Sequence, residues 1–298
     1  MRPPIYLALA LASTGPQLSI AADPASTVTV IWSEGVESPG VCVGKESWFV
    51  SVIPADVPLE TIETATLHRA NDSVEGRILH LDPAQRLCLL EAAPGLGMSR
   101  PVTLSTATQL KAGEHAECIS GSSACQTTVA GKDWSYRGER FPLPLLRLRV
   151  SEEGPHCKAG TPLVSENGEL MAILTGQKLE ASGEVYAIPS SRVLKLIEDV
   201  KLHKRSGPVW IGLIFHNESS TPEIIEVKDA SPALKAGLKP GDVILAMNSV
   251  EIESLDDLVE AIHDLPAGTE VKVRVLRGLN ETQLDLVPQF AEMMAASQ

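Results

Sequence analysis

Short apolar runs separated by turn residues fill the chain from Thr27 to Ala187. Clear examples are TVTVIW at 27–32, RLCLLEA at 86–92, LLRLRV at 145–150 and ELMAILTG at 169–176. Runs of this length, separated by Gly, Pro, Asn and Asp, are typical of a β-sandwich or β-barrel and not of alternating β–α units. The pattern therefore predicts a mostly β domain over residues 22–203, and Asn167–Gly168 is expected to form a tight hairpin turn between two of its strands.

A helix is expected to close this domain. In PSSRVLKLIEDVKLHK, residues 189–204, apolar side chains recur at helical spacing, and Ser190 or Ser191 is available as the N-cap. The apolar side of this helix would consist of Val193, Leu194, Leu196, Ile197 and Val200. Residues 204–208 then form a predicted linker.

Residues 209–288 form a second predicted unit, in which strands and helices are mixed. Gly237 is placed to end a short helix, and Lys239–Asp242 has the composition of a turn. A second helix is expected over SLDDLVEAIHDL, residues 254–265. The strand after the turn would bury alternate side chains, namely Val243, Leu245 and Met247. Residues 289–298 remain as a C-terminal tail.

Composition and charge narrow the class of protein. The 298 residues suggest about two domains, and the net charge of −13 argues against a nucleic-acid partner, which needs clustered Lys and Arg. The seven histidines show no metal-binding spacing, and no phosphate-binding loop is present. We therefore expect neither a metal nor a cofactor.

Residues 1–21 have the layout of a secretory signal. Arg2 precedes a short apolar core from Ile5 to Leu11, and Ser19 and Ala21 offer a small-residue cleavage site. The core is too short to span a bilayer as a helix. We expect an exported protein, periplasmic or extracellular, with no membrane span in the mature chain.

Export permits disulfides, and the chain has five cysteines. Cys118 and Cys125 flank a short segment that could form a hairpin, and Cys42 with Cys157 is a second candidate pair. Cys88 lies in an apolar run and is expected to be a buried thiol. Spacing alone leaves the pairing open.

The second unit resembles a PDZ domain. The resemblance rests on SPALKAGLKPGDVILAMNSVEIESLDDLVEAI, residues 231–262, including Ala236–Gly237–Leu238 and Pro240–Gly241–Asp242. It implies an α+β fold that adds an extended peptide to a sheet edge and holds the terminal carboxylate in a backbone nest.

The resemblance also indicates which residues bind the peptide. The nest would be Trp210, Ile211, Gly212 and Leu213. The strand that pairs with the peptide would contain Ile214 and Phe215, and the helix wall of the groove would contain Leu255, Leu258 and Ile262. Apolar residues on a helix face are more often core residues, and this alternative stays open for the three helix positions.

The whole mature chain resembles the HtrA/Deg family of exported, trypsin-like serine proteases. The segments that carry the resemblance are GRILHLDPAQRLCLLEA at 76–92, GTPLVSENGELMAI at 160–173 and VYAIPSSRVLKLIEDV at 185–200. It implies a trypsin-like double β-barrel with a closing helix, followed by one PDZ domain. It also implies oligomers, either of this chain or mixed with an active relative.

The chain departs from the family at every position of the catalytic triad. The motifs place Pro54 at the histidine, Arg86 at the aspartate and Ala159 at the serine, and Cys157 replaces a glycine of the oxyanion loop. A shift of one or two residues restores none of the three. Cys157 and Thr161 lie close enough to be considered as alternative nucleophiles, but each would still need a base. Loss of a triad typically lowers turnover by about 10⁴- to 10⁶-fold.

These observations favour a non-catalytic HtrA-like protein that binds peptide or protein C-termini through its PDZ domain. The protease-like domain would then act as a scaffold or an interaction surface. Two alternatives remain open: a divergent but active peptidase of envelope quality control, and a subunit that docks on an active relative and regulates it.

Overall fold

The structure is a computed structural model that describes residues 26–105, 110–120, 123–133, 145–150, 158–179, 182–216 and 220–291. The predicted signal segment, residues 292–298 of the predicted tail, and Cys157 lie outside these ranges. No helix in the described ranges is both long enough and apolar enough to cross a membrane.

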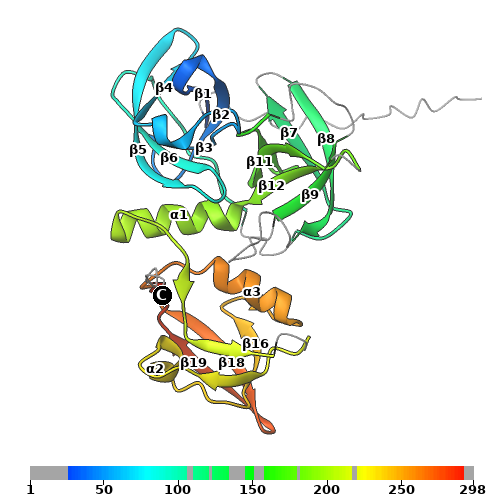
Figure 1. Ribbon diagram of the computed structural model, residues 1–298. Helices are drawn as coiled ribbons and strands as arrows, with labels where there is room; N and C mark the ends of the chain where they lie inside the picture. The colour runs from blue at the N-terminus through cyan, green and yellow to red at the C-terminus, as the bar shows by residue number, and fades with distance from the viewer. Residues whose placement is uncertain are drawn as a thin grey trace, which may run out of the picture.

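Six antiparallel strands form the first closed barrel, in the order β1-β2-β3-β6-β5-β4 (Figure 1). They are β1 (Thr27–Ile31), β2 (Glu37–Cys42), β3 (Trp48–Val52), β4 (Thr64–Arg69), β5 (Asp72–Asp82) and β6 (Leu87–Ala92). Short 3₁₀ turns at Ser33–Gly35 and Leu59–Thr61 lie between strands. Phe49, Leu67 and Leu90 are fully buried in the centre of this barrel. Closure leaves the barrel with no free sheet edge.

A second closed barrel follows, in the order β10-β11-β12-β9-β8-β7. Its strands are β7 (His115–Ser120), β8 (Ser123–Asp133), β9 (Leu145–Val150), β10 (Pro162–Val164), β11 (Leu170–Lys178) and β12 (Val185–Pro189). The expected mostly β fold with two barrels is confirmed. The turn at Asn167–Gly168 is also confirmed, because Gly168 has φ +78° and its N–H bonds the carbonyl of Ser165.

Helix α1 (Ser190–His203) lies below both barrels and separates them from the second unit (Figure 1). Val193, Leu196, Ile197 and Val200 are buried, as expected, in an apolar cluster that also contains residues of both barrels. Leu194 is an exception: it is 38% exposed, because it faces away from the barrels toward the second unit.

The expected serine N-cap of α1 is wrong. Pro189 holds the N-cap position, with extended backbone angles and no side-chain cap. Ser190 is the first helical residue, and its hydroxyl donates a hydrogen bond of 3.1 Å to the carbonyl of Ser105. The serine therefore ties the helix to the segment before the second barrel, a long-range contact that outweighs local capping.

The second unit is built around a four-stranded antiparallel sheet in the order β17-β16-β18-β19, with two small sheets, β13-β20 and β14-β15. Its strands are β13 (Val209–Trp210), β14 (Leu213–Phe215), β15 (Ile224–Val227), β16 (Val243–Met247), β17 (Val250–Glu251), β18 (Val271–Arg277), β19 (Asn280–Leu286) and β20 (Gln289–Phe290). Its helices are α2 (Pro232–Ala236) and α3 (Leu255–His263). Both expected helices are confirmed, and Gly237 ends α2 with φ +83°.

The expected alternation along β16 is wrong by one residue. Ile244 is buried in the core cluster, Ala246 is buried outside that cluster opposite Arg274, and Val243 and Leu245 are only partly buried. Met247 is buried as expected, but for another reason: the register between β16 and β18 shifts between Ile244 and Ala246. Such an irregularity adds a residue to one strand and breaks the strict alternation of faces.

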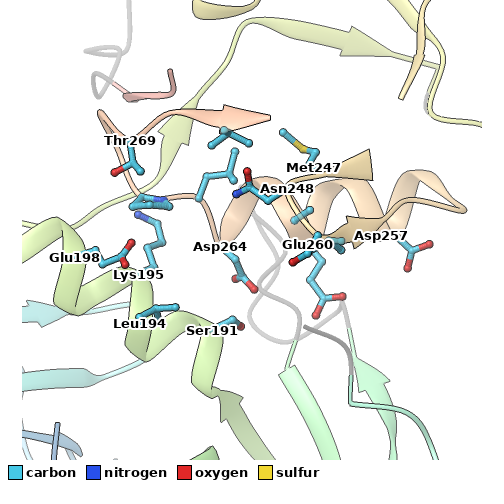
Figure 2. A pocket seen from close by; sticks show the side chains of 16 residues that line it. Ser191, Leu194, Lys195, Glu198, Met247, Asn248, Asp257, Glu260, Asp264 and Thr269 are labelled. Atoms are coloured by element: carbon cyan, nitrogen blue, oxygen red, sulfur yellow. The ribbon is translucent and has the colours of Figure 1, made fainter. Parts of the chain in front are cut away.

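Helix α1 faces α3 and the start of β18 across the junction between the barrels and the second unit (Figure 1). A cavity with a volume of about 360 Å³ lies between α1 and α3 (Figure 2). Direct polar contacts close the junction beside it.

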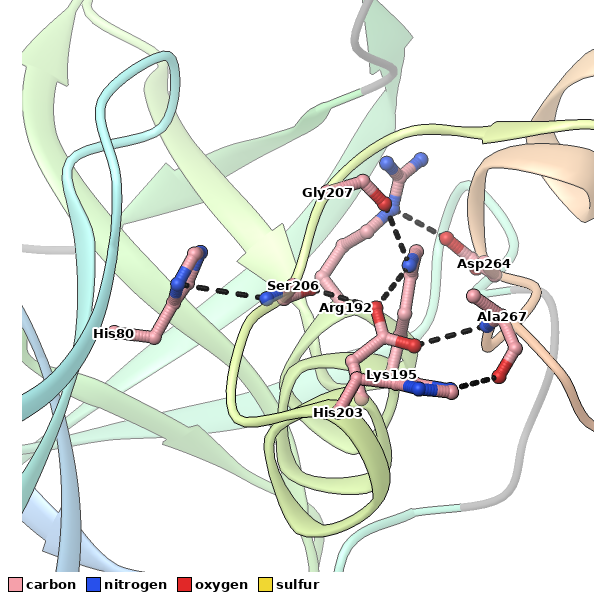
Figure 3. Close-up of polar contacts among 9 residues, drawn as sticks. His80, Arg192, Lys195, His203, Ser206, Gly207, Asp264 and Ala267 are labelled. Atoms are coloured by element: carbon pink, nitrogen blue, oxygen red, sulfur yellow. Dashed lines mark hydrogen bonds and ion pairs between the residues drawn. The ribbon is translucent and has the colours of Figure 1, made fainter. Parts of the chain in front are cut away.

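Figure 3 shows the side chains of this junction, and the buried carboxylate of Asp199 accepts three of its hydrogen bonds. These bonds come from the Lys195 ammonium at 2.5 Å, the Ser206 hydroxyl at 2.7 Å and the Ala267 N–H at 2.9 Å. The His203 ring donates to the Ala267 carbonyl at 2.8 Å. One carboxylate thus joins α1, the linker and the loop after α3.

Candidate functional site

The positions that resemble the triad histidine and aspartate lie together in the first barrel. Pro54 follows β3, and Arg86 precedes β6. The Arg86 Nε donates a hydrogen bond of 2.9 Å to the Ile53 carbonyl, and its Nη2 donates to the carbonyls of Pro54, at 2.6 Å, and Val57. The guanidinium therefore holds the loop after β3, which contains the position expected for the triad histidine.

This arrangement provides no acid–base chemistry. Pro54 has no titratable side chain, and an arginine stays protonated at any physiological pH. The nearest upstream carboxylate, Asp82, is also occupied: its Oδ1 accepts hydrogen bonds from the N–H groups of Ala84 at 2.9 Å and Gln85 at 3.2 Å. Asp82 shapes the turn and does not orient a base.

Ala159, the residue expected at the position of the nucleophile, is tightly packed. It is 7% exposed and belongs to the apolar cluster between the barrels and α1. The next residue, Gly160, has φ +87°, and a Cβ there would lie 2.3 Å from the Pro39 carbonyl oxygen. A Cβ at Gly176 would lie 2.8 Å from the Ala159 nitrogen. The backbone of this segment is therefore pressed against both β2 and β11.

Thr161 was the second candidate for a nucleophile near this position. Its side chain is fully buried, and its hydroxyl has no hydrogen-bond partner among the described residues. A hydroxyl needs an adjacent base to become a nucleophile. Cys157, the other candidate and the residue at the oxyanion loop, lies outside the described residues.

Four cysteines are buried. Cys118 lies opposite Cys125 in the register of β7 and β8, and its Sγ is 3.2 Å from the Thr127 hydroxyl. Cys42 donates a hydrogen bond of 3.4 Å to the Lys45 carbonyl. Cys88 is fully buried in β6, as expected. The pairs Cys118–Cys125 and Cys42–Cys157 stay predictions.

The predicted carboxylate nest, Trp210–Leu213, is fixed against the start of α2. Gly212 has φ +81°, and a Cβ there would lie 2.2 Å from the Cβ of Ser231, the N-cap of α2. The Ile211 carbonyl accepts a hydrogen bond of 3.0 Å from the Ala233 N–H. Only glycine fits at position 212, because both the angle and the space exclude a side chain.

The residues predicted to form the walls of the groove lie on β14 and α3. β14 pairs with β15 along one edge, and within the described ranges no strand pairs with its other edge. Ile214 and Phe215 on this strand are partly buried, as are Leu255 and Ile262 on α3. Leu258 is fully buried in the core and has no surface to offer a ligand.

Sequence reasoning missed the ion pair that supports the turn before β16. The Arg277 guanidinium donates two hydrogen bonds of 2.7 Å to the Asp242 carboxylate, which is 1% exposed. The Lys239 N–H donates to the same carboxylate at 2.9 Å. The two partners are far apart in sequence, and no local signal joins them.

Among the described side chains, no group of three or more His, Cys, Asp or Glu residues is placed to hold a metal ion.

Comparisons with known proteins agree with the domain organisation described above. Residues 209–287 match the family model of the PDZ domain. The chain is 24% identical over 233 residues to a probable periplasmic serine endoprotease, DegP-like, of Pseudomonas putida, which covers 72% of this chain and 48% of the relative. It is 23% identical over 244 residues to the putative serine protease HhoB of Synechocystis, covering 72% and 58%. The chain thus spans about half the length of the curated relatives it matches.

Solved structures share the fold. The serine endoprotease from Yersinia pestis aligns with a TM-score of 0.53 at 18% identity, covering 92% of this chain and 97% of that one. The HtrA-type protease AlgW with a tripeptide aligns with a TM-score of 0.59 at 16% identity, covering 92% and 96%. The double barrel is therefore trypsin-like. The chain contains a PDZ domain and is a homologue of the DegP and HtrA serine endoproteases, whose fold it shares.

Proposed function

We propose that this protein is a non-catalytic member of the HtrA-like group that binds peptide or protein C-termini through its PDZ domain. The observation that carries the proposal is the hydrogen bond from the Arg86 guanidinium to the Pro54 carbonyl. A triad aspartate orients the histidine and stabilises its imidazolium, and a guanidinium at that position would repel an imidazolium. Packed Ala159 supplies no nucleophile.

Three features support peptide binding by the second domain. The outer edge of β14 offers backbone groups for an added strand. Gly212 allows the backbone of the nest to approach a carboxylate closely. Leu255 and Ile262 of α3 provide partly buried apolar surface and pack against the same core as Phe215 of that strand. The expected ligand is an extended peptide with a free carboxylate and apolar final residues.

The protein would act outside the cytoplasm. Residues 1–21 have the layout of a secretory signal, and the name of the Pseudomonas relative places that protein in the periplasm. The protease-like domain, without turnover, would act as a scaffold or as a surface for its own copies or for an active relative.

Peptide binding can be tested by fluorescence anisotropy with labelled peptides that end in apolar residues. We expect saturable binding of peptides with a free carboxylate and a loss of at least about tenfold in affinity when the terminus is amidated. Equal affinity of the amidated peptides would contradict the nest.

Matched variants locate the groove. Leu255→Glu and Ile262→Glu each bring a carboxylate to the proposed wall and are expected to weaken binding about tenfold or more. Leu279→Glu introduces the same charge at a residue that is 97% exposed on the β18–β19 hairpin, and it should bind like the parent protein. Unfolding curves of all three variants separate lost binding from a lost fold.

A further inference from the structure

The cavity between α1 and α3 has the size of a small-molecule site. Its volume of about 360 Å³ lies within the usual range for ligand pockets, roughly 300 to 1,000 Å³. It lies where two domains meet, a common place for such sites. Its lining comes from α1, α3, the turn between β16 and β17, and the start of β18.

Much of the cavity wall is apolar. Leu194 projects from α1, and facing it are side chains of the second domain that include Met247, Val250, Leu265 and Val271. These surfaces suit the methylene groups of a ligand and not a compact, fully hydrated ion.

In the part of the lining that the structure describes, carboxylates outnumber cations. Three of the carboxylates in or beside it are already paired: Asp199 with Lys195, Glu260 with Lys132, and Asp264 with Arg192. Lys195, the one cation among the described lining residues, is further held by the Gly207 carbonyl at 2.9 Å.

Two lining carboxylates are not neutralised. No described residue forms an ion pair or a hydrogen bond with the Glu198 carboxylate on α1. Asp257, on α3, uses its Oδ2 to cap the helix with Ser254, and its Oδ1 accepts no hydrogen bond from the described part of the chain. In Figure 2 these two side chains lie at opposite ends of the cavity, with Glu260 and Asp264 between them.

We propose that this cavity binds a linear aliphatic diamine, with one ammonium group at Glu198, the other at Asp257, and the methylene chain along the apolar wall. Two positive charges match the two unpaired carboxylates, and a flexible apolar spacer matches the surface between them.

The proposed diamine site is separate from the peptide groove. Asp257 and Glu260 of α3 and Asp264 at its C-cap follow one another at helical spacing on the side that faces α1. Leu255 and Ile262 belong to the groove side and do not line the cavity. A diamine and a C-terminal peptide could therefore be bound at the same time.

The experiment is isothermal titration calorimetry of the full chain with hexamethylenediamine at low ionic strength. Shorter and longer diamines in the same series report which spacing fits. Hexylamine removes one ammonium group and is expected to bind about threefold to fivefold more weakly, the contribution of one partly exposed ion pair. Hexanediol, which keeps the spacer without charge, should not bind measurably.

Substitutions in the cavity wall test where the diamine binds. Glu198→Gln and Asp257→Asn should each weaken diamine binding about threefold to fivefold. Leu194→Lys places an ammonium group in the cavity and should abolish binding, and because Leu194 is exposed, this variant is expected to fold normally. Glu63→Gln removes one negative charge from an exposed position in the first barrel and serves as the matched control.

The control is needed because the chain has a net charge of −13 and attracts any cation weakly. Binding that saturates, falls in Glu198→Gln and persists in Glu63→Gln would support the site. Absence of saturable binding, equal weakening in Glu63→Gln, or equal binding of hexanediol would overturn it.

Discussion

The Arg86 guanidinium donates a hydrogen bond of 2.6 Å to the Pro54 carbonyl, so the two positions that resemble the aspartate and histidine of a triad are joined directly. The same side chain also bonds the carbonyls of Ile53 and Val57. These bonds hold the loop after β3 against the start of β6. The contact gives Arg86 a structural role at the position expected for the triad aspartate.

The first prediction concerns this contact. Arg86→Ala removes charge-assisted hydrogen bonds to three carbonyls and is expected to destabilise the protein by about 2–3 kcal/mol, measured by urea unfolding. Arg86 has φ +56°, so Arg86→Gly loses the same bonds but relieves the backbone and should be about 1 kcal/mol more stable than Arg86→Ala. If the two variants were equally stable, the positive φ of Arg86 would not strain the backbone. If both were as stable as the parent protein, the hydrogen bonds of Arg86 would not stabilise the fold.

The second prediction concerns pH and the Asp242–Arg277 pair. Burial alone would raise the pKa of Asp242, but the Arg277 guanidinium and the Lys239 N–H outweigh it and hold the pKa below its ordinary value of 3.8. Because the folded-state pKa is lower, the stabilisation is complete above pH 3.8 and is lost as the pH falls through the folded-state pKa.

Asp242→Asn tests this prediction by comparison with the parent protein. We expect the variant to be about 2 kcal/mol less stable at neutral pH, as measured by urea unfolding, and the difference to shrink below pH 3.8. A difference that is constant across this range would mean that the charge of Asp242 does not contribute.

The third prediction concerns the junction around Asp199. Asp199→Ala leaves the Lys195 ammonium buried without a carboxylate and is expected to cost about 3–5 kcal/mol. It also frees Ser206, so trypsin should cut faster at exposed Lys204 and Arg205 in the linker. Adding Lys195→Met removes the stranded charge and should recover at least about 1 kcal/mol. No recovery in the double variant would contradict the pairing.

Sequence patterns predicted the strands and the closing helix because each depends on local alternation or helical spacing. They also predicted the Gly237 cap and the turn at Asn167–Gly168, where the residue type fixes the backbone. The prediction of which side chains β16 buries was wrong, because the irregularity between Ile244 and Ala246 arises from pairing with β18. The alternation of apolar residues along one strand carries no information about how that strand pairs with its neighbour.

In the candidate sites too, some features can be predicted from the sequence and others depend on long-range contacts. The absence of a histidine near Pro54 and of a serine near Ala159 can be read from the sequence alone. The bonds from Arg86 to Ile53, Pro54 and Val57 cannot, because their acceptors are backbone carbonyls, which every residue has. The full burial of Leu258, against the partial burial of Leu255, depends on which side of α3 meets the sheet.

The fourth prediction concerns Cys42. Burial raises the pKa of its thiol to about 12, so the thiol is protonated at pH 8 and should resist alkylation in the native protein. Unfolding in urea without reductant should expose Cys42 and Cys88 to iodoacetamide, detected by mass spectrometry of peptides. Reactivity of Cys42 only after reduction would contradict this prediction. It would indicate that Cys42 forms a disulfide, with Cys157 as the candidate partner.

The most direct test of the non-catalytic proposal is cleavage by the full chain. The protein is incubated with denatured casein and a peptide pool, and new termini are counted by mass spectrometry, with a DegP-like relative as positive control and the Cys157→Ala variant alongside. We expect no termini beyond those found in buffer, for either form of the protein. New termini that increase with protein concentration and disappear in Cys157→Ala would contradict the proposal and identify an active, divergent peptidase.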